Sequence, residues 1–396
     1  MSEIRASAKL PLGMTPARFL REYWQKRPLL IRGFAGTGID SIGPDDLAGL
    51  ACEEAALSRI VRHDPRHDRW TLRNGPFAEK DFAKLGTRDW TLLVQDVDKW
   101  DMDVARLLER FAFLPSWRID DVMISYATEG GGVGPHVDQY DVFLVQGMGR
   151  RRWRIDETAQ PNHAFREDSE LRLLRHFSPT RDWLLEAGDA LYLPPGVPHD
   201  GVAVGECMTW SVGMRAPAQA ELLLDFAEFL AEPLGESRRY TDPDLAPARD
   251  EGEIDAAALR RVRTAMPLFA GADDATLATW FGRFITRYRS AQFAATPARQ
   301  LDARALLQRL PGALALRNPF SRIAWIRHGR AAELFVAGDA WRCPLPLARL
   351  IAAEREIAGE RLVAACASPG AQAVLVDLFR LGHLQLARRR PRSRAH

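Results

Sequence analysis

The sequence predicts an α+β protein that begins with a jelly-roll or barrel domain, continues as a helical segment and ends in a small winged-helix-like module. Two observations support this prediction. Between about residues 119 and 217 the chain consists of short β-like runs separated by clusters of Gly, Pro, Asp and Asn. After residue 217 the apolar residues recur at helical spacing instead. The 396 residues, 46% of them hydrophobic, can build two or three domains with a sizeable core.

The N-terminal region is a mixture of helix and strand. The segment MTPARFLREYWQKRPLLIRGF has apolar residues at helical spacing and then a strand-like end, and PDDLAGLACEE is typical of a capped helix. Six β-like runs follow, with a turn expected at residues 147–149 between the second and the third: VMISYA, YDVFLVQG, RRWRI, DALYLP, GVAVG and MTWSVGMR. Short strands with such turns are typical of a jelly roll or barrel.

The C-terminal half is expected to contain two different parts. Three segments, AQAELLLDFAEFLAEPL, DAAALRRVRTAMPLF and DATLATWFGRFITRYRS, each carry one apolar stripe. They make only a thin bundle, so their apolar faces predict a partner, namely a second copy of the chain. The strand pair SRIAWIR and AELFVAG, set among helices, predicts the winged-helix-like module. We expect the jelly-roll or barrel domain at 1–217, a helical dimerisation segment at 218–295, the winged-helix-like module at 296–387 and a basic tail at 388–396.

Composition excludes several classes of protein. The sequence has no run of about 18 uncharged apolar residues and no signal-peptide core at its start, so we expect a cytoplasmic protein without a membrane partner. The four cysteines form no CxxC pair, which fits a reducing compartment. Subtracting the five arginines of RRRPRSRAH from the net charge of +2 leaves −3 for the rest. The tail is either a solvated end or an electrostatic contact for RNA; direct nucleic-acid binding by the folded part is doubtful.

A metal site is predicted by three residues from two places in the sequence. His136 and Asp138 are two apart in a strand-like run, so their side chains are expected on one face, about 6–7 Å apart. Such a pair alone also fits a surface turn or an ion pair. His199, after a strand and a Pro-Pro-Gly turn, can reach the same point from a neighbouring antiparallel strand. Two imidazoles and one carboxylate form the facial triad that suits non-heme Fe(II), with three positions left for a chelating 2-oxo acid and O2. A zinc hydrolase needs only one open position.

A binding residue for the 2-oxo acid is expected in the run GRRRWRI. Strand alternation points Arg151 away from the side of Arg150 and Arg152. If Trp153 packs inward, Arg151 shares its face and can pair with the distal carboxylate. The alternative is three solvent-facing arginines in a turn.

One strand before the triad suggests the kind of substrate. Asp121, Met123 and Ser125 alternate and therefore share a face. A carboxylate on the metal-facing side has little purpose unless it meets a cation, and a guanidinium fits it bidentately. Asp120 competes with Asp121, and strand phase alone does not separate them.

At these positions the sequence resembles the JmjC-type ribosomal oxygenases, also called the cupin-4 family. The resemblance is carried by the His136–Val–Asp138 run, PPGVPHDG with His199, GRRRWRI and FLREYWQKRPLLIRGF. It extends along essentially the whole chain and is strongest from residue 10 to 215. It is similar to the bacterial branch, whose members hydroxylate an arginine of large-subunit ribosomal protein sixteen.

The resemblance implies a JmjC double-stranded β-helix, a helical dimerisation segment and a C-terminal winged-helix-like domain. It also implies Fe(II), 2-oxoglutarate and O2 as cofactor and cosubstrates, a ribosomal protein substrate and a homodimer. By resemblance, the site positions are the iron ligands His136, Asp138 and His199, the 2-oxoglutarate-binding Arg151 and Ser125, and the substrate-pocket residues Asp121, Met123, Tyr140 and Ser211. From the residues alone, Met123 and Tyr140 also fit core packing, and the hydroxyl of Ser211 can bond its own sheet.

Three functions therefore remain open. The first is an Fe(II)- and 2-oxoglutarate-dependent hydroxylase acting on an arginine of a ribosomal protein. The second keeps this chemistry but acts on histidine, asparagine or methylated lysine; a carboxylate at Asp121 disfavours asparagine. The third is a non-enzymatic cupin-like regulator that binds nucleic acid through its C-terminal module, which the complete triad and Arg151 disfavour.

Overall fold

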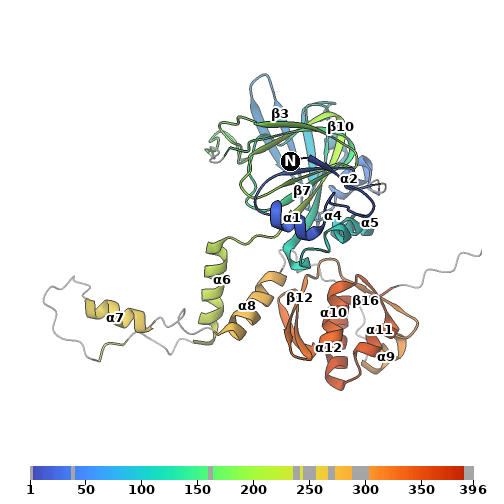
Figure 1. Ribbon diagram of the computed structural model, residues 1–396, viewed down its shortest axis with the longest axis vertical. Helices are drawn as coiled ribbons and strands as arrows, with labels where there is room; N and C mark the ends of the chain where they lie inside the picture. Colours follow the sequence, from blue (N-terminus) through green and yellow to red (C-terminus); the bar gives the residue numbers. More distant parts are fainter. Residues whose placement is uncertain are drawn as a thin grey trace, which may run out of the picture. The chain divides into compact units, whose positions relative to one another are not determined.

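A computed structural model of the chain divides into two compact units, residues 1–216 and 217–396 (Figure 1). The residues that the structure describes are 3–36, 41–158, 164–234, 241–243, 256–265, 273–287 and 303–387. The basic tail expected at 388–396 lies outside these ranges. No helix within them is long and apolar enough to cross a lipid bilayer.

The first unit is built on one ten-stranded sheet, with neighbours in the order β1-β2-β9-β7-β10-β6-β5-β3-β4 and β8 paired to β7. The strands are β1 (Glu3–Arg5), β2 (Leu29–Arg32), β3 (Ser58–Asp64), β4 (Arg69–Asn74), β5 (Trp90–Val94), β6 (Ile119–Ala127), β7 (Val142–Ile155), β8 (Arg181–Glu186), β9 (Ala190–Leu193) and β10 (His199–Met214). The long strand β10 lies between β7 and β6 and is antiparallel to both. This central trio carries most of the residues discussed below.

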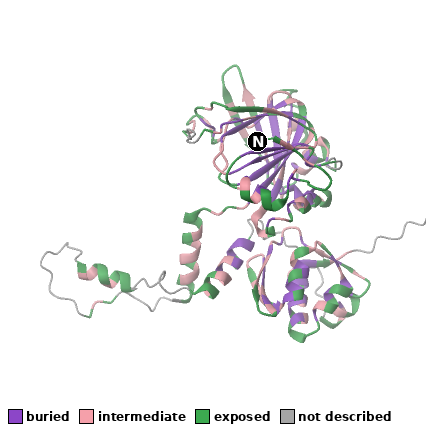
Figure 2. Cartoon of the chain, viewed as in Figure 1, coloured by how far each residue is buried: buried purple, intermediate pink, exposed green. Residues whose placement is uncertain are grey.

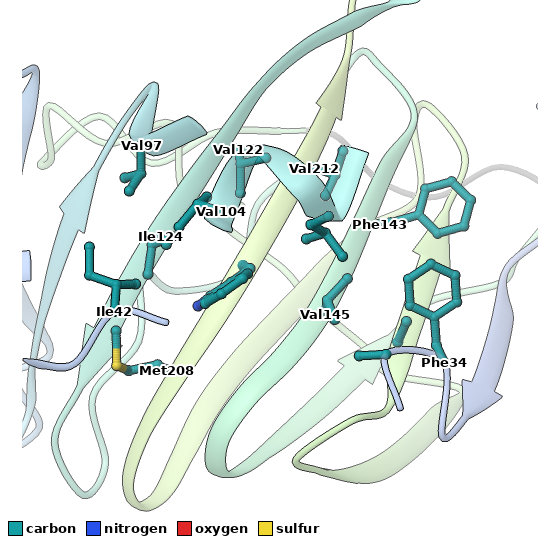
Figure 3. Packing of buried hydrophobic residues seen from close by; sticks show 14 of the residues in the cluster. Phe34, Ile42, Val97, Val104, Val122, Ile124, Phe143, Val145, Met208 and Val212 are labelled. Atoms are coloured by element: carbon teal, nitrogen blue, oxygen red, sulfur yellow. The ribbon is translucent and has the colours of Figure 1, made fainter. Parts of the chain in front are cut away.

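Short helices cover one face of this sheet. They are α1 (Pro16–Glu22), α2 (Pro44–Leu50), α3 (Glu79–Phe82), α4 (Val97–Trp100) and α5 (Met102–Arg106), with 3-10 turns at Leu107–Phe111 and Ser116–Arg118. Val97 of α4 and Val104 of α5 belong to the same buried apolar cluster as the strand residues Val122, Ile124 and Phe143 (Figure 3). The buried strands and inward helix faces form a continuous core (Figure 2). A second, smaller apolar cluster that includes Val142, Leu144, Trp153 and Ile155 lies on the opposite phase of these strands. Buried polar side chains share that phase.

Strand β6 shows this division residue by residue. Val122 and Ile124 belong to the apolar core, whereas Asp121 and Ser125 are buried polar residues of the opposite phase. The alternation expected from Asp121 to Ser125 is therefore present, and Asp121 is the more buried of the two competing acids, since Asp120 is only partly buried.

Two expectations about the strands were wrong. The turn expected at residues 147–149 does not exist, because β7 runs unbroken from Val142 to Ile155. GVAVG and MTWSVGMR likewise form one strand, β10. The glycines instead accompany an irregular register between Val204 and Thr209, where Gly149 and Gly205 have φ angles of 64° and 75°. Glycine accepts this conformation without strain, so a bulge replaces the turn.

The second unit contains helices and two three-stranded sheets, β15-β11-β16 and β12-β13-β14. Its elements are α6 (Gln219–Ala231), a 3-10 turn (Glu232–Leu234), α7 (Ala256–Ala265), α8 (Asp274–Thr286), α9 (Ala303–Arg309), β11 (Leu314–Arg317), β12 (Ile323–His328), β13 (Ala331–Val336), β14 (Asp339–Pro344), α10 (Leu345–Ala353), β15 (Glu356–Ala358), α11 (Gly359–Ala365), α12 (Pro369–Arg380) and β16 (Leu384–Leu386). The expected strand pair is confirmed as β12–β13, and all three expected helices are present as α6, α7 and α8. Helix α8 packs on the sheet of β12, β13 and β14, since Gly282 lies directly against the ring of Phe335. The exact boundary between the helical segment and the module stays a prediction.

Candidate active site

The three predicted metal ligands meet at the start of β10. His136 and His199 form an isolated antiparallel bridge, with both backbone N–H···O hydrogen bonds at 3.0 Å. Asp138 lies in the loop that follows, where its carbonyl accepts a hydrogen bond from Gly196 at 2.8 Å. The expectation of a strand around His136 and Asp138 is therefore wrong, but both side chains do converge with His199, as expected. The loop between residues 134 and 141 brings the carboxylate to the imidazoles without strand alternation.

The geometry of these side chains fits one metal ion. One ligand atom from each of His136, Asp138 and His199 lies within 4.8 Å of the other two. The Nδ1 atoms of the two histidines are 2.9 Å from the carbonyls of Gly134 and Val197, which fixes each ring with Nε2 as the free ligand atom. Burial lowers the pKa of His199 to about 4, and the neighbouring His136 adds to this effect. A neutral imidazole is the form that binds a metal.

Arg151 lies buried on the same side of the sheet. It is 4% exposed, whereas Arg150 and Arg152 on either side of it face solvent. Trp153, two residues further along, packs inward. The centroid of its ring is 5.4 Å from the Arg151 guanidinium carbon and 5.9 Å from the centroid of the His199 ring. The Trp153 ring occupies the space where a side chain at position 201 would stand, which explains the glycine there.

The Arg151 guanidinium has neutral hydrogen-bond partners. Its Nη1 donates to Ser125 Oγ and to Thr209 Oγ1, both at 3.1 Å. Its Nε is buried without a partner among the described residues. Burial lowers the pKa of Arg151, which shows that the charged form is poorly solvated there. A buried cation with donors to spare fits a carboxylate ligand such as that of a 2-oxo acid.

Sequence reasoning missed two members of this cluster. Thr209 faces Ser125 directly in the register of β10 against β6, and its hydroxyl also donates to Gln146 at 3.0 Å. Both are buried polar side chains in otherwise apolar strands. The sequence did contain a signal for both of them, namely a polar residue inside an otherwise apolar strand.

Asp121 lies on the same face of β6, at the other end from Ser125. Its Oδ2 accepts the backbone N–H of Asp96 at 3.2 Å. Burial raises the pKa of Asp121 to about 7, and the acidic neighbours Asp96, Asp120 and Asp98 add to the rise. The nearest lysine, Lys99, is paired with Asp98. Asp121 is thus a buried carboxyl group in acidic surroundings.

The other predicted pocket residues surround Asp121. Ser211 faces Met123 in the β10–β6 register, and Gly213 faces Asp121. A methyl group at Gly213 would lie 3.4 Å from Asp121 Oδ1 and 3.9 Å from the Tyr140 ring, so Asp121 and Tyr140 both lie beside this glycine. Arg59, which the sequence did not indicate, has its Nη2 3.7 Å from the Met123 sulfur.

Tyr140 connects this pocket to the triad. Its hydroxyl hydrogen-bonds to Asp138, while 41% of the residue stays exposed. Desolvation raises the pKa of Tyr140 above its ordinary value, and the Asp138 charge adds to the rise, so the phenol stays a donor. The loop between residues 134 and 141, which is not a strand, places Tyr140 beside Asp138.

Comparison with known proteins identifies the family. A JmjC domain model matches residues 106–222, and a ROXA-like winged helix model matches residues 270–385. The ribosomal protein uL16 3-hydroxylase of Escherichia coli strain K12 is 42% identical over 272 residues, which cover 68% of this chain and 71% of that protein. The chain belongs to the JmjC ribosomal oxygenases.

Solved structures agree with this assignment. The X-ray structure of E. coli ycfD matches with a TM-score of 0.84 and 35% identity, covering 95% of this chain and 99% of that one. A structure of YcfD, a ribosomal oxygenase, in complex with cobalt and 2-oxoglutarate matches with a TM-score of 0.80 and 34% identity, over 95% and 99% of the two chains. The expected fold, with its JmjC β-helix and winged helix, is confirmed. So is the enzyme class: this oxygenase is an Fe(II)- and 2-oxoglutarate-dependent dioxygenase.

Proposed function

We propose that this oxygenase hydroxylates an arginine side chain of ribosomal protein uL16. The E. coli relative bears the name of a uL16 3-hydroxylase. In this chain the single observation that supports an arginine is the buried carboxyl group of Asp121, which has acidic neighbours. A guanidinium is the side chain that such a carboxylate binds best, because its planar fork donates two parallel hydrogen bonds. The competing substrates histidine and methyl-lysine lack that fork.

In this proposal His136, Asp138 and His199 hold the iron, and Arg151 with Ser125 binds the distal carboxylate of 2-oxoglutarate. Bound together, the metal and cosubstrate supply the oxidant that inserts one atom of O2 into a substrate C–H bond, with release of succinate and carbon dioxide. The protein residues supply positions. Asp121 and Ser211 would anchor the guanidinium, while Met123 and Tyr140 flank the aliphatic stem. The distance between anchor and triad then decides which carbon is oxidised.

Mass spectrometry of ribosomal proteins tests this proposal. We expect uL16 from cells with the active enzyme to carry one added oxygen on one arginine. Deletion of the gene, or replacement by the Asp138→Ala variant, removes it. An oxygen that persists in both backgrounds, or one that appears on a histidine of another protein, would contradict the proposal.

We propose that the enzyme acts as a homodimer. Helix α6 presents Leu223 and Leu224, which are 57% and 74% exposed, and α7 presents Leu259 at 49%. Burying such apolar side chains against a second copy is favourable. Leu224→Glu should shift the enzyme from dimer to monomer in sedimentation, whereas Leu57→Glu, at an exposed leucine of the first unit, should not. A ribosomal protein substrate also implies action in the cytoplasm, and direct nucleic-acid binding by the winged-helix module stays doubtful.

A further inference from the structure

Asp96 lies directly beside the proposed guanidinium site. It precedes α4 and has a left-handed backbone, with φ 59° and ψ 26°. Aspartate, asparagine and glycine adopt this conformation more readily than other residues. The turn is closed by the N–H of Lys99, which donates to the Asp96 carbonyl at 2.8 Å. In this conformation the Asp96 N–H points at Asp121 and donates to its Oδ2 at 3.2 Å.

The Asp96 carboxylate adds a charge to that contact. Asp96 is 7% exposed and Asp121 is 9% exposed, so both acids are withdrawn from water. After burial itself, Asp96 is the strongest influence that raises the pKa of Asp121. Like charges in a buried site repel strongly, because little solvent screens them.

The other acids around Asp121 have different tasks. Asp98 is almost fully buried; it pairs with Lys99 and accepts the N–H of Val122 at 2.9 Å. Its charge is therefore compensated where it stands. Asp120 is only partly buried, and the register of β6 against β10 is irregular at its position, between Ile119 and Asp121. Of the four acids, Asp96 and Asp121 are the pair joined directly by a hydrogen bond at the pocket.

We propose that Asp96 is a specificity-determining residue, which orients Asp121 through its N–H and supplies a second negative charge that makes the pocket require a cation. This inference rests on the proposed function, since the cation is the guanidinium of the substrate arginine. A guanidinium held by Asp121 also lies in the field of the Asp96 carboxylate, whose charge acts on Asp121 more strongly than that of Asp120 or Asp98. Its positive charge also offsets the repulsion between the Asp96 and Asp121 carboxylates. A neutral side chain of the same shape gives neither benefit.

The test removes the Asp96 charge and keeps its backbone. Asp96→Asn retains the left-handed conformation and the N–H, and Asp96→Gly does so without any side chain. The control is Asp89→Asn, another left-handed aspartate, with φ 62°. Thermal unfolding establishes that each variant folds. Dissociation constants are then measured by calorimetry, anaerobically, for a synthetic uL16 peptide that contains the target arginine and for the same peptide with citrulline.

We expect Asp96→Asn and Asp96→Gly to weaken binding of the arginine peptide about tenfold, the range of one charge-assisted hydrogen bond. Binding of the citrulline peptide should change less than about twofold, because citrulline has the shape but not the charge, and Asp89→Asn should change neither. Equal weakening for both peptides would mean that Asp96 has a purely structural role and would overturn the inference. Unchanged binding of the arginine peptide would overturn it as well. A wild-type enzyme that turns over 2-oxoglutarate but neither binds nor hydroxylates the arginine peptide would overturn the proposed function, and this inference with it.

Discussion

The two ends of strand β6 carry opposite charges in the same kind of environment. At Ser125 the buried guanidinium of Arg151 meets two neutral hydroxyls and has a donor to spare. At Asp121, four residues and about 13 Å away along the strand, a buried carboxyl group is surrounded by other acids. Burying either charge away from water without an oppositely charged partner destabilises the folded protein.

Two buried groups of opposite charge allow one sheet to select two different ligands. A buried cation is satisfied by an anionic cosubstrate, and a buried anion is satisfied by a cationic substrate. The facial triad at the start of β10 lies on the same side of the sheet, so under the proposed function each ligand has its own electrostatic anchor. We therefore expect a substitution at one end of β6 to weaken the binding of one ligand and to leave the binding of the other unchanged.

The largest effect is expected where both ligands depend on the same group. His199→Ala removes one of three metal ligands, so we expect activity to fall about a thousandfold or more. Bound iron, measured by elemental analysis, should fall with it. His176→Ala changes an exposed histidine and should retain both. Full iron binding by the His199→Ala variant would contradict the assignment.

Arg151→Met tests the cationic end. We expect the KM for 2-oxoglutarate to rise about a hundredfold, because a buried carboxylate loses its cation. The melting temperature without ligands should not fall, since an undersolvated charge is replaced by an apolar group of similar length. Arg152→Met, one residue along at an exposed position, should affect neither quantity. A large drop in melting temperature for Arg151→Met would show that the guanidinium is a structural group.

The anionic end predicts a pH dependence. The pKa of Asp121 is raised to about 7 in the protein, so the carboxyl group loses its charge below that pH. We expect kcat/KM for the arginine substrate to fall up to tenfold for each pH unit below 7. The uncoupled turnover of 2-oxoglutarate without substrate provides the reference profile. Asp121→Asn should lower kcat/KM and flatten this acid limb.

The free energy of unfolding depends on pH in the opposite direction from kcat/KM. A carboxyl group whose pKa is higher in the folded state contributes stability at low pH, and this contribution is lost as the pH rises towards 7. Asp121→Asn should therefore melt higher than the wild type at pH 8, and the difference should shrink at pH 5. Identical differences at both pH values would contradict an Asp121 that titrates near neutrality.

The smallest effect is expected for the hydroxyls that hold Arg151. Thr209→Val keeps the side-chain shape and removes one hydrogen bond, so we expect the KM for 2-oxoglutarate to rise about threefold. Thr91→Val, at a buried threonine that bonds the Gly132 carbonyl, is the matched control. An unchanged KM in Thr209→Val would mean that Arg151 needs no such support.

The sequence was sufficient where local periodicity decides the structure. The alternation of β6 and of the arginine run placed Ser125 and Arg151 on buried positions, because period two is a property of any strand, but it left Asp120 and Asp121 unseparated. It failed at His136 and Asp138, whose approach depends on a loop that alternation does not describe. It also missed the union of RRWRI with the preceding run, because a glycine in a bulge and a glycine in a turn have the same sequence signal.

Long-range partners were beyond local reasoning altogether. Thr209 and Ser125 are far apart in the chain and meet only through the register of β10 on β6. Asp96 reaches Asp121 through a left-handed turn between β5 and α4, which no periodic pattern indicates. Such pairings depend on tertiary packing, so only the structure could give them.

Both Michaelis constants of Asp121→Asn, measured with the arginine-containing uL16 peptide and with 2-oxoglutarate varied in turn, show whether the two ligands are anchored separately. If each end of β6 anchors its own ligand, the KM for the peptide rises at least about tenfold while the KM for 2-oxoglutarate stays within about twofold of the wild type. A peptide KM that does not change, or two constants that rise together, would contradict it.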